Sequence, residues 1–430
     1  MGRLMTEKLL LLVDIYCLGF LMPPVILSAN SLRSTTGWLD KTRSMKVNEQ
    51  IKDALRPTIE LFEDIRKENK IAIMYIQRLI NPDVGIKDFA EIHGIVEVDS
   101  DKYRFSSGEG PGEAISATKK QIENQLIDGA LIISDDRLKS DQILNPPGYV
   151  TDFMKIYQGR AVVHEYTKFT HFLMNHLNIS EAEFRAFSDA AAENSRRAYI
   201  EFLGKEPKRN PEKDKIPITD LFTRADCTNP YMDFSGAMLI GNQKLAKEYG
   251  LENRTHILGA NHVANYSLDI AKLVRYTHLS KAYFNTCEQI GISFKKLFLD
   301  LNPERRVLFN AYTCFPNQTA ISLRATNLVE HREGFVPFLK KYLITSGGDM
   351  HDRRSPWNAH THEVGIDLFN LIESGKTDLG TIIYNGGASK EQGVAIFGDP
   401  NMPELIEKAY QYNPRERIDG IPFERPETVA

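Results

Sequence analysis

The chain has 430 residues, of which 42% are hydrophobic and 26% charged, and its formal net charge is −4. This length exceeds one small module, and the composition excludes disorder, collagen and coiled coil as the main structure. The nearly balanced charge supplies no global field for nucleic acid or an anionic membrane. Its four cysteines are widely spaced without a C-x-x-C pair. We therefore expect a reduced, cytoplasmic protein of the size of an enzyme, with neither a disulfide framework nor a zinc knuckle.

The N-terminal segment 9–27 is strongly apolar and follows a basic start at Arg3, as in a secretory signal. Asp14 interrupts this segment and Pro23-Pro24 breaks its end, whereas a membrane span needs about 20 uninterrupted apolar residues. We expect a buried first strand with its flanking loop and no membrane span. A cleaved signal or an anchor is the alternative.

The next segments predict helix-then-strand units. Apolar residues recur every three or four positions from Val47 to Ile65, which predicts an amphipathic helix that contains Pro57. The run Ile71–Ile76 suits a buried strand. A second helix at 115–126 precedes an apolar strand at 130–133.

The middle of the chain is expected to be helical from His164 to Leu203. Ser180 and Glu183 form a capping-box pattern inside that stretch, which marks a helix start. Residues 204–216 are charged and contain proline, so we interpret them as a surface loop.

The second half repeats this pattern. Strands are predicted at 237–240, 256–258, 307–312, 381–384 and 393–397, with a short helix from residue 245. Alternating helices and buried strands in both halves indicate a layered α/β fold. The weak similarity of the halves permits internal duplication.

The first two of four candidate loops carry glycines and a possible nucleophile. In 106–112, Gly108 and Gly110 allow close approach to a ligand, and the amides that open the next helix suit an oxyanion; a structural turn is the alternative. In 312–317, Cys314 follows a buried strand and is either a nucleophile or a small buried hydrophobe. Tyr312 is an acid or base candidate if its pKa is lowered.

The other two loops are rich in glycine and polar side chains. The stretch 347–358 contains His351, Ser355 and Asn358, with two further histidines and a glutamate close behind. We expect no metal there, because H-x-H without an ordered third ligand is a weak pattern. In the loop that follows the strand at 381–384, the side chain of Asn385, beside Gly386, suits donation to a substrate carbonyl.

In this order, the four loops resemble those of the thiolase superfamily over residues 95–400. The segment of this chain that reads SSGEGPGEAISATKKQIENQLIDGALII resembles the family's nucleophile helix and the strand after it. The segment YTCFPNQTA resembles the loop that carries the family's Asn-Glu-Ala motif. The SPWN loop takes the place of Gly-His-Pro, and NGGASKEQGVAIF that of the C-terminal Cys-x-Gly loop. The resemblance implies a duplicated five-layered αβαβα architecture. Its N-terminal half would be 1–235, with an insertion at about 135–215, and its C-terminal half 236–430.

The departures from this pattern concern the catalytic groups. The resemblance puts Gly108 where the nucleophilic cysteine belongs, Ser355 at the Gly-His-Pro histidine and Asn385 at the second catalytic cysteine. Claisen chemistry needs a thiolate and a base, so ordinary thiolysis is not expected. The pattern is closer to cysteine-less thiolase-like proteins, some of which are named acetyl-CoA acetyltransferase after their relatives.

The resemblance implies an acyl-CoA-binding protein of lipid metabolism, with coenzyme A as part of the substrate, no separate cofactor and no metal. It is expected to form a homodimer or to pair with a thiolase-type partner. The catalytic candidates are Tyr312, Cys314 and His351. The substrate-binding candidates are Gly108, Gly110, Ser355, Asn358, Asn385 and Gly386.

Two alternative functions stay open. One is a thiolase-like aldolase that acts on a β-hydroxyacyl-CoA, with Tyr312 as acid or base and a small OB-fold partner. The other is a non-catalytic subunit of a thiolase-type complex. An acyltransferase that depends on Cys314 is less expected than either.

Overall fold

The computed structural model of the protein describes most of the chain between Pro23 and Pro400. The described residues are 23–34, 44–76, 86–95, 104–105, 110–137, 139–140, 162–204, 206, 212, 215–223, 226, 233–264, 277–291, 307–312, 315–343, 360–386 and 391–400. Of the apolar segment 9–27, only the last five residues belong to this set, and Val25 begins a buried strand. Within these ranges, no helix has both the length and the apolar character that a membrane crossing requires.

The elements alternate as the sequence predicts. Those before residue 242 are β1 (Val25–Ser34), α2 (Ser44–Ile65), β2 (Ile71–Ile76), α3 (Ile86–His93), β3 (Arg104–Phe105), α4 (Gly110–Glu123), β4 (Gly129–Arg137), α7 (Val162–Leu177), α8 (Glu181–Leu203) and β5 (Asp233–Gly241). Those after it are α10 (Gln243–Glu248), β6 (His256–Ala264), α12 (Thr277–Ile290), β7 (Val307–Ala311), α13 (Pro316–Ala325), η3 (Arg332–Gly334), α14 (Phe335–Lys341), α15 (His360–Glu373), β8 (Leu379–Gly386) and β9 (Glu391–Gly398).

Local sequence signals account for several of these boundaries. The capping box is formed as predicted, because the Glu183 amide donates to the Ser180 hydroxyl and the Glu183 carboxylate accepts from the Ser180 amide. The stretch from His164 to Leu203 is therefore two helices, α7 and α8, and not one. Strand β2 covers the predicted run Ile71–Ile76.

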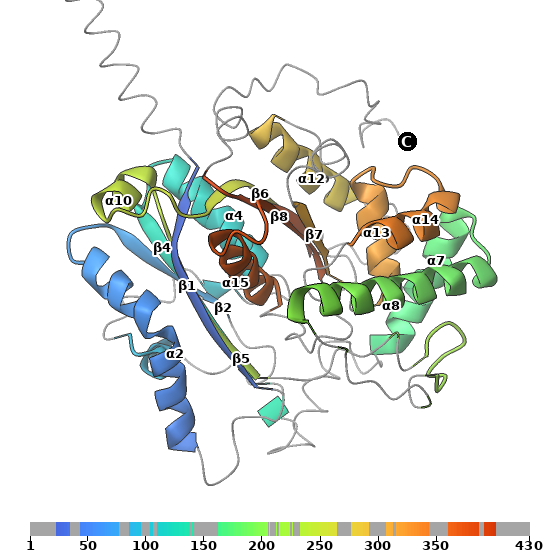
Figure 1. The fold of residues 1–430 in the computed structure, drawn as a ribbon, viewed down its shortest axis with the longest axis horizontal. Coiled ribbons are helices and arrows are strands. Elements are labelled where there is room, and N and C mark those ends of the chain that lie inside the picture. The colour runs from blue at the N-terminus through green and yellow to red at the C-terminus, as the bar shows by residue number, and fades with distance from the viewer. Residues whose placement is uncertain are drawn as a thin grey trace, which may run out of the picture.

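The described strands form one nine-stranded mixed sheet (Figure 1). Its order is β3-β2-β4-β5-β1-β6-β9-β8-β7. In the first half, β3, β2 and β4 are parallel, and β5 and β1 follow in antiparallel pairing. In the second half, β7 and β8 are parallel, and β9 and β6 follow in antiparallel pairing. The single pair between Val25 and His256 joins β1 to β6.

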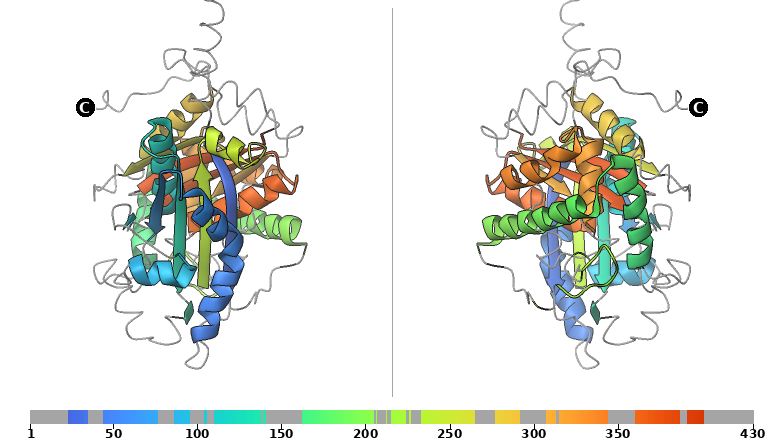
Figure 2. Two further views of the ribbon diagram at one scale, coloured as in Figure 1. Left: turned by 90° about the vertical axis from the view of Figure 1, so that its left-hand side faces the viewer. Right: turned by 90° about the vertical axis from the view of Figure 1, so that its right-hand side faces the viewer.

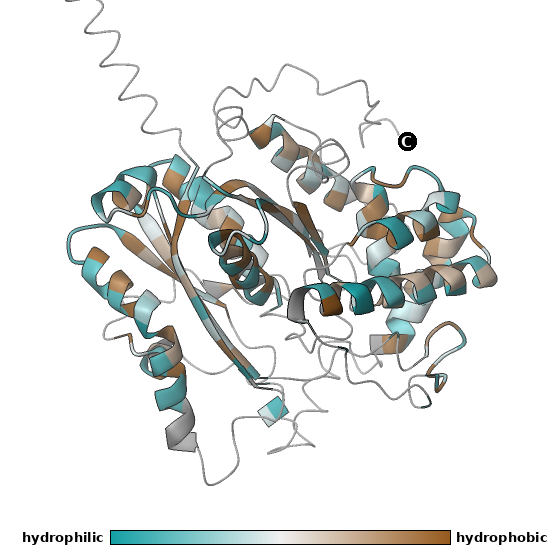
Figure 3. Ribbon diagram, viewed as in Figure 1, coloured by the Kyte–Doolittle hydropathy of each residue, from teal (hydrophilic) through white to brown (hydrophobic). Residues whose placement is uncertain are grey.

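Helices and sheet alternate in five layers. The helices α2 and α3 cover the outer face of the first sheet half, where their apolar stripe packs on β1, β4 and β5. The helices α4 and α15 lie between the two sheet halves and share one core with both. The helices α12, α13 and α14 cover the outer face of the second half. Figure 1 shows α15 at the centre of this arrangement, and Figure 3 shows that the central strands are mostly hydrophobic.

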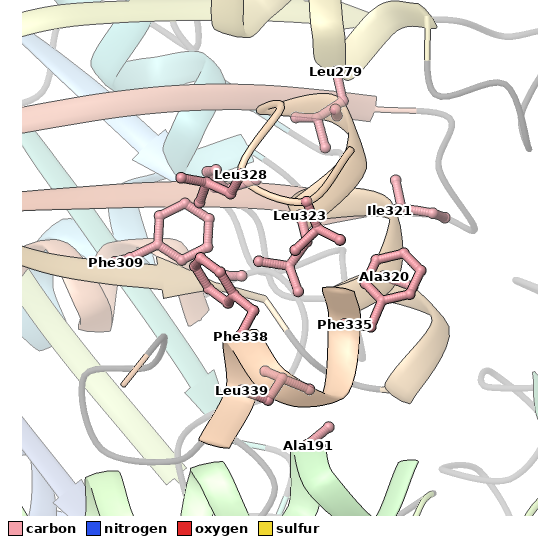
Figure 4. Close-up of a cluster of buried hydrophobic side chains, with 14 of the residues drawn as sticks. Ala191, Leu279, Phe309, Ala320, Ile321, Leu323, Leu328, Phe335, Phe338 and Leu339 are labelled. Atoms are coloured by element: carbon pink, nitrogen blue, oxygen red, sulfur yellow. The ribbon is translucent and has the colours of Figure 1, made fainter. Parts of the chain in front are cut away.

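The predicted insertion forms the outermost layer beside the second half. Figure 2 shows α8 across one side of the molecule and α2 across the opposite side. The Phe187 ring packs on the Phe335 ring with centroids 5.3 Å apart, and the Asn194 amide donates to the Leu339 carbonyl at 2.7 Å. Figure 4 shows how α13 and α14 fill the space between α8 and Phe309 of β7. This layer encloses the outer face of β7, whose end carries a candidate site residue.

The two halves are built on the same plan. Both α4 and α15 have 14 residues, and each leads into a strand, β4 or β8, that continues into an antiparallel partner. Strands β1 and β6 share an Ile-Leu-x-Ala-Asn sequence and a register irregularity at its Ile-Leu step, beginning at Ile26 and Ile257. The fold is therefore an internal duplication. The predicted boundary at 235/236 falls inside β5, and the division at that point stays a prediction.

Candidate functional site

Four residues of the second sheet half lie side by side at the end where β7 and β8 finish. The Tyr312 amide donates to the Ile383 carbonyl at 2.9 Å, which continues the parallel register and places Tyr312 beside Tyr384. Gly393 pairs with Tyr384 on one side and with His262 on the other. Paired residues point to the same face of a sheet, here toward the central helices. We call Tyr312, Tyr384, Gly393 and His262 the Tyr-His row.

The equivalent positions of the first sheet half form a second row. Ile76 pairs with Ser134, Ser134 with Gly236, and Gly236 with Ser31. We call these four residues the serine row. The two rows face each other across α4 and α15, so each central helix contacts both.

The Tyr384 ring is enclosed by two glycines. A Cβ at Gly112, in the first turn of α4, would lie 2.2 Å from Tyr384 Cζ, and one at Gly393 would lie 2.0 Å from the Tyr384 hydroxyl. Real Cβ atoms do not approach so closely, so only glycine on both sides leaves room for the ring. Tyr384 is 1% exposed, and the two glycines confine its ring to one position.

The Tyr384 hydroxyl reaches the imidazole of His262. The oxygen is 3.3 Å from His262 Nδ1, and the two rings stack with centroids 5.9 Å apart at 18°. Burial lowers the pKa of His262 to about 4, because a charged imidazole is poorly solvated there. The imidazole is therefore neutral at pH 7.

Tyr312 packs against the first residue of α15. Its ring centroid lies 4.7 Å from that of His360, with the planes tilted by 58°, and both side chains are buried. A phenol and an imidazole thus share one enclosed place at the end of β7. Phenol and imidazole groups both serve as acids or bases in catalysis, which is the role that the sequence suggested for Tyr312 alone.

In the serine row the aromatic ring comes from the central helix α15 and not from the sheet. The Ser134 hydroxyl lies 2.6 Å from Nδ1 of His362, two residues along α15 from His360. His362 is wholly buried, and burial, with a contribution from His93, lowers its pKa to about 3. His360 and His362 therefore face opposite sheet halves. Among the described residues, no cluster of His, Cys, Asp or Glu is arranged to hold a metal ion.

The structure describes only part of the site that the sequence suggested. Tyr312 lies in the Tyr-His row, and Gly110 begins α4 against Phe105 and Ile76. The backbones of Asn385 and Gly386 end β8, where they pair with β9. The other candidates lie outside the described residues: Gly108, Cys314, His351, Ser355 and Asn358.

Sequence reasoning missed Tyr384, His262 and His360 as members of the site. The signal for Tyr384 was its position as the last residue of a predicted strand, directly before the fourth loop. The signal for His262 was its place four residues beyond the strand predicted at 256–258. Neither signal shows by itself that the two residues meet.

The comparisons with known proteins show to which solved structures this fold is similar. No family model matches the sequence, and no curated protein matches it. The structure is similar to a monomeric SCP2-thiolase-like protein of type 1 from Mycobacterium smegmatis, with 14% identity and a TM-score of 0.62 over 87% of this chain and 77% of that one.

Two further solved structures have a similar fold. An Ltp2-ChsH2(DUF35) aldolase matches with 11% identity and a TM-score of 0.59 over 88% of this chain and 98% of that chain. Human mitochondrial 3-ketoacyl-CoA thiolase in complex with CoA matches with 12% identity and a TM-score of 0.57, again over 88% and 98%. Such identities establish the fold and leave the chemistry to the site. The resemblance predicted from the four loops is confirmed at this level: the chain has the thiolase fold.

Proposed function

We propose that this protein binds an acyl-CoA thioester where β7 and β8 end beside the first turn of α4, and that it does not carry out ordinary thiolysis. The observation that carries the proposal is the Tyr-His row, in which Tyr312 and Tyr384 are buried, His262 is partly buried and Tyr384 lies against that turn. The row supplies hydroxyl and imidazole groups where the surrounding core is apolar, which suits recognition of a thioester oxygen. The CoA complex among the similar structures supports the same ligand class.

The absence of thiolysis follows from the residue at the nucleophile position. The resemblance assigns that position to Gly108, which has no side chain to accept an acyl group. Binding without acyl transfer to a cysteine is therefore the expected behaviour. Incubation with acetyl-CoA followed by intact-protein mass spectrometry should show no acyl adduct, and an adduct on Cys314 would contradict this part of the proposal.

Calorimetric titration tests binding directly. Wild-type protein is titrated with acetyl-CoA and, separately, with CoA, which lacks the acyl oxygen. Tighter binding of acetyl-CoA supports recognition of the thioester. No measurable heat with either ligand at millimolar concentration would rule out the proposed ligand class.

A second candidate function is carbon–carbon cleavage of a β-hydroxyacyl-CoA, which the contact between Tyr312 and His360 favours. In this reaction a base takes the proton of the β-hydroxyl, the bond between Cα and Cβ breaks, and the electron pair passes to the thioester as an enolate. The hydroxyl carbon leaves as an aldehyde or ketone, and the enolate is protonated at Cα to give the shorter acyl-CoA. Tyr312, packed against His360, is the group that we propose for the proton transfers.

Turnover of a β-hydroxyacyl-CoA, followed by mass spectrometry of both products, tests this candidate. The Tyr312→Phe variant should lose at least about 100-fold in turnover, the usual contribution of one acid or base group. Tyr249→Phe, on the surface end of α10 away from the row, is the matched control and should retain activity. Equal turnover by Tyr312→Phe and wild type would end this candidate.

The partner and the compartment are also proposals. We infer a cytoplasmic role in lipid metabolism, either as a homodimer or with a partner; one similar structure is named as monomeric and another as a complex with a DUF35 protein. A chain that binds acyl-CoA, shows no turnover and co-purifies with an active thiolase would be the non-catalytic subunit. A small OB-fold partner in the same pull-down, together with turnover, would support the aldolase.

A further inference from the structure

The pair of Tyr384 and His262 has a geometry that the proposed function does not yet use. Tyr384 is buried, and Gly112 and Gly393 hold its ring in one position. His262 lies at the more accessible end of the same row and is only partly buried. The fixed Tyr384 ring, which lies against Gly112 in the first turn of α4, therefore contacts a second ring that is only partly buried.

The hydrogen bond between the two side chains sets which imidazole nitrogen carries the proton. The Tyr384 hydroxyl lies 3.3 Å from His262 Nδ1, and a phenol, which is protonated at neutral pH, can donate to an unprotonated nitrogen at this distance. A neutral imidazole that accepts at Nδ1 carries its proton at Nε2. The neutral state agrees with the low pKa of His262, about 4, which burial causes. His262 then offers an N–H donor on the ring edge away from Tyr384.

The position of this donor fits a ligand at the α4 end. His262 shares the row with Tyr384, whose ring touches the backbone of Gly112 in the first turn of α4. An acyl group that lies over this turn has oxygen acceptors and no donors in its thioester. A neutral N–H donor complements such an oxygen without bringing a buried charge.

We propose that His262 is a substrate-binding residue that donates a hydrogen bond from Nε2 to an oxygen of the bound acyl thioester, and that Tyr384 is the positioning residue that fixes this tautomer. The inference rests on the proposed binding of acyl-CoA. It adds the donor and its tautomer, neither of which follows from thioester binding itself.

The tautomer is measured first, because this experiment needs no ligand. Long-range proton–nitrogen NMR of the ¹⁵N-histidine protein should show His262 protonated at Nε2, and Tyr384→Phe should lose this preference. Assignment of the signal comes from its disappearance in His262→Gln. A wild-type signal protonated at Nδ1 would overturn the proposal, whether or not acyl-CoA binds.

The role in binding is tested with paired variants and two ligands. His262→Leu should bind acetyl-CoA about tenfold more weakly, the effect of one lost hydrogen bond, with unchanged affinity for CoA. His262→Gln places an amide N–H near the Nε2 position and should keep affinity within about threefold. His278→Leu, a partly buried histidine of α12 outside the row, is the control and should bind as wild type.

The outcomes separate the two levels of the proposal. If wild type binds acetyl-CoA and His262→Leu binds it equally well, the role of His262 is wrong while the proposed function stands. If wild type binds neither ligand, the proposed function fails. Should His262→Leu not fold, the comparison of His262→Gln with wild type, together with the tautomer measurement, still decides the question.

Discussion

The first turns of α4 and α15 occupy equivalent places in the two halves, but they are filled in opposite ways. The third residue of α4 is Gly112, and it leaves space for the ring of Tyr384, the sixth residue of β8. The third residue of α15 is His362, and its ring reaches Ser134, the sixth residue of β4. In one half the sheet provides the ring and the helix provides the gap; in the other half these parts are exchanged.

This exchange shows what a duplicated core must keep and what it can change. Packing density is preserved if the summed volume of helix residue and strand residue stays similar, whichever partner is larger. The choice of partner decides the chemistry. In the first turn of α4, Gly112 has no side chain and its backbone lies against the Tyr384 ring. The first turn of α15 instead consists of buried polar side chains, from His360 to Glu363. We expect ligand recognition at the first end and a structural role for His362 at the second.

The largest effect should come from filling the gap at Gly112. A Cβ there would overlap a ring that Gly393 also confines, so Gly112→Val should lower the free energy of unfolding by about 3 kcal/mol. Urea denaturation measures the loss. The control is Gly110→Ala, whose nearest neighbour would be 3.1 Å away and whose effect should stay below about 1 kcal/mol. Rescue of Gly112→Val by Tyr384→Ala is expected, and its failure would argue against the packing described.

The next effect is a dependence of stability on pH that His362 confers. Its pKa of about 3 in the folded chain is below the ordinary value near 6.5, so the unfolded chain binds more protons between these two values. The stability that the neutral His362 imidazole contributes is therefore fully present above about pH 6.5, and it is lost as the pH falls toward about 3. Between pH 7 and pH 5 the loss should be about 2 kcal/mol.

Comparison of variants isolates this contribution. Unfolding of wild type and His362→Gln is followed across pH 5 to 7, and the difference between the two curves should shrink as the pH falls. Parallel curves for His362→Gln and wild type would contradict a buried neutral imidazole.

A smaller effect is expected from the partner of His362. Ser134→Ala leaves the imidazole nitrogen without its hydroxyl, which should cost about 1–2 kcal/mol. In the double-mutant cycle with His362→Leu, the two losses should not add, because the second substitution removes the group that the first leaves unpaired. Strict additivity would show that the hydrogen bond does not contribute.

The smallest effect concerns the ends of the two helices. The equivalent residues Gln125 and Gly375 both have left-handed backbones, with φ of 57° and 65°, and both precede a residue that donates to the fifth carbonyl back. Gln125→Gly should therefore stabilise the chain by about 0.5–1 kcal/mol, and Gly375→Ala should destabilise it by a similar amount. Thermal unfolding of both variants checks the pair; a loss of stability in Gln125→Gly would contradict the equivalence.

Local pattern was enough to find most elements of this protein. The capping box at Ser180 and the apolar run Ile71–Ile76 depend on neighbours within a few residues, so they were visible in the chain itself. The order of the four loops led further, to the thiolase fold. Tyr312 was also within reach, because it is the last residue of a predicted buried strand and the YTCF sequence resembles the strand end of thiolase-like aldolases.

The contacts of the site depended on the tertiary structure alone. His262 and Tyr384 are separated by 122 positions, and Ser134 and His362 by 228. No periodicity links residues so far apart, since their meeting depends on strand order and on the layer that separates the two rows. The amino-acid sequence by itself determined that the chain alternates helices and buried strands, and it led to the prediction that Gly108 stands at the thiolase nucleophile position. Only the packing of two equivalent helices between two sheet halves decided which rings face which gaps.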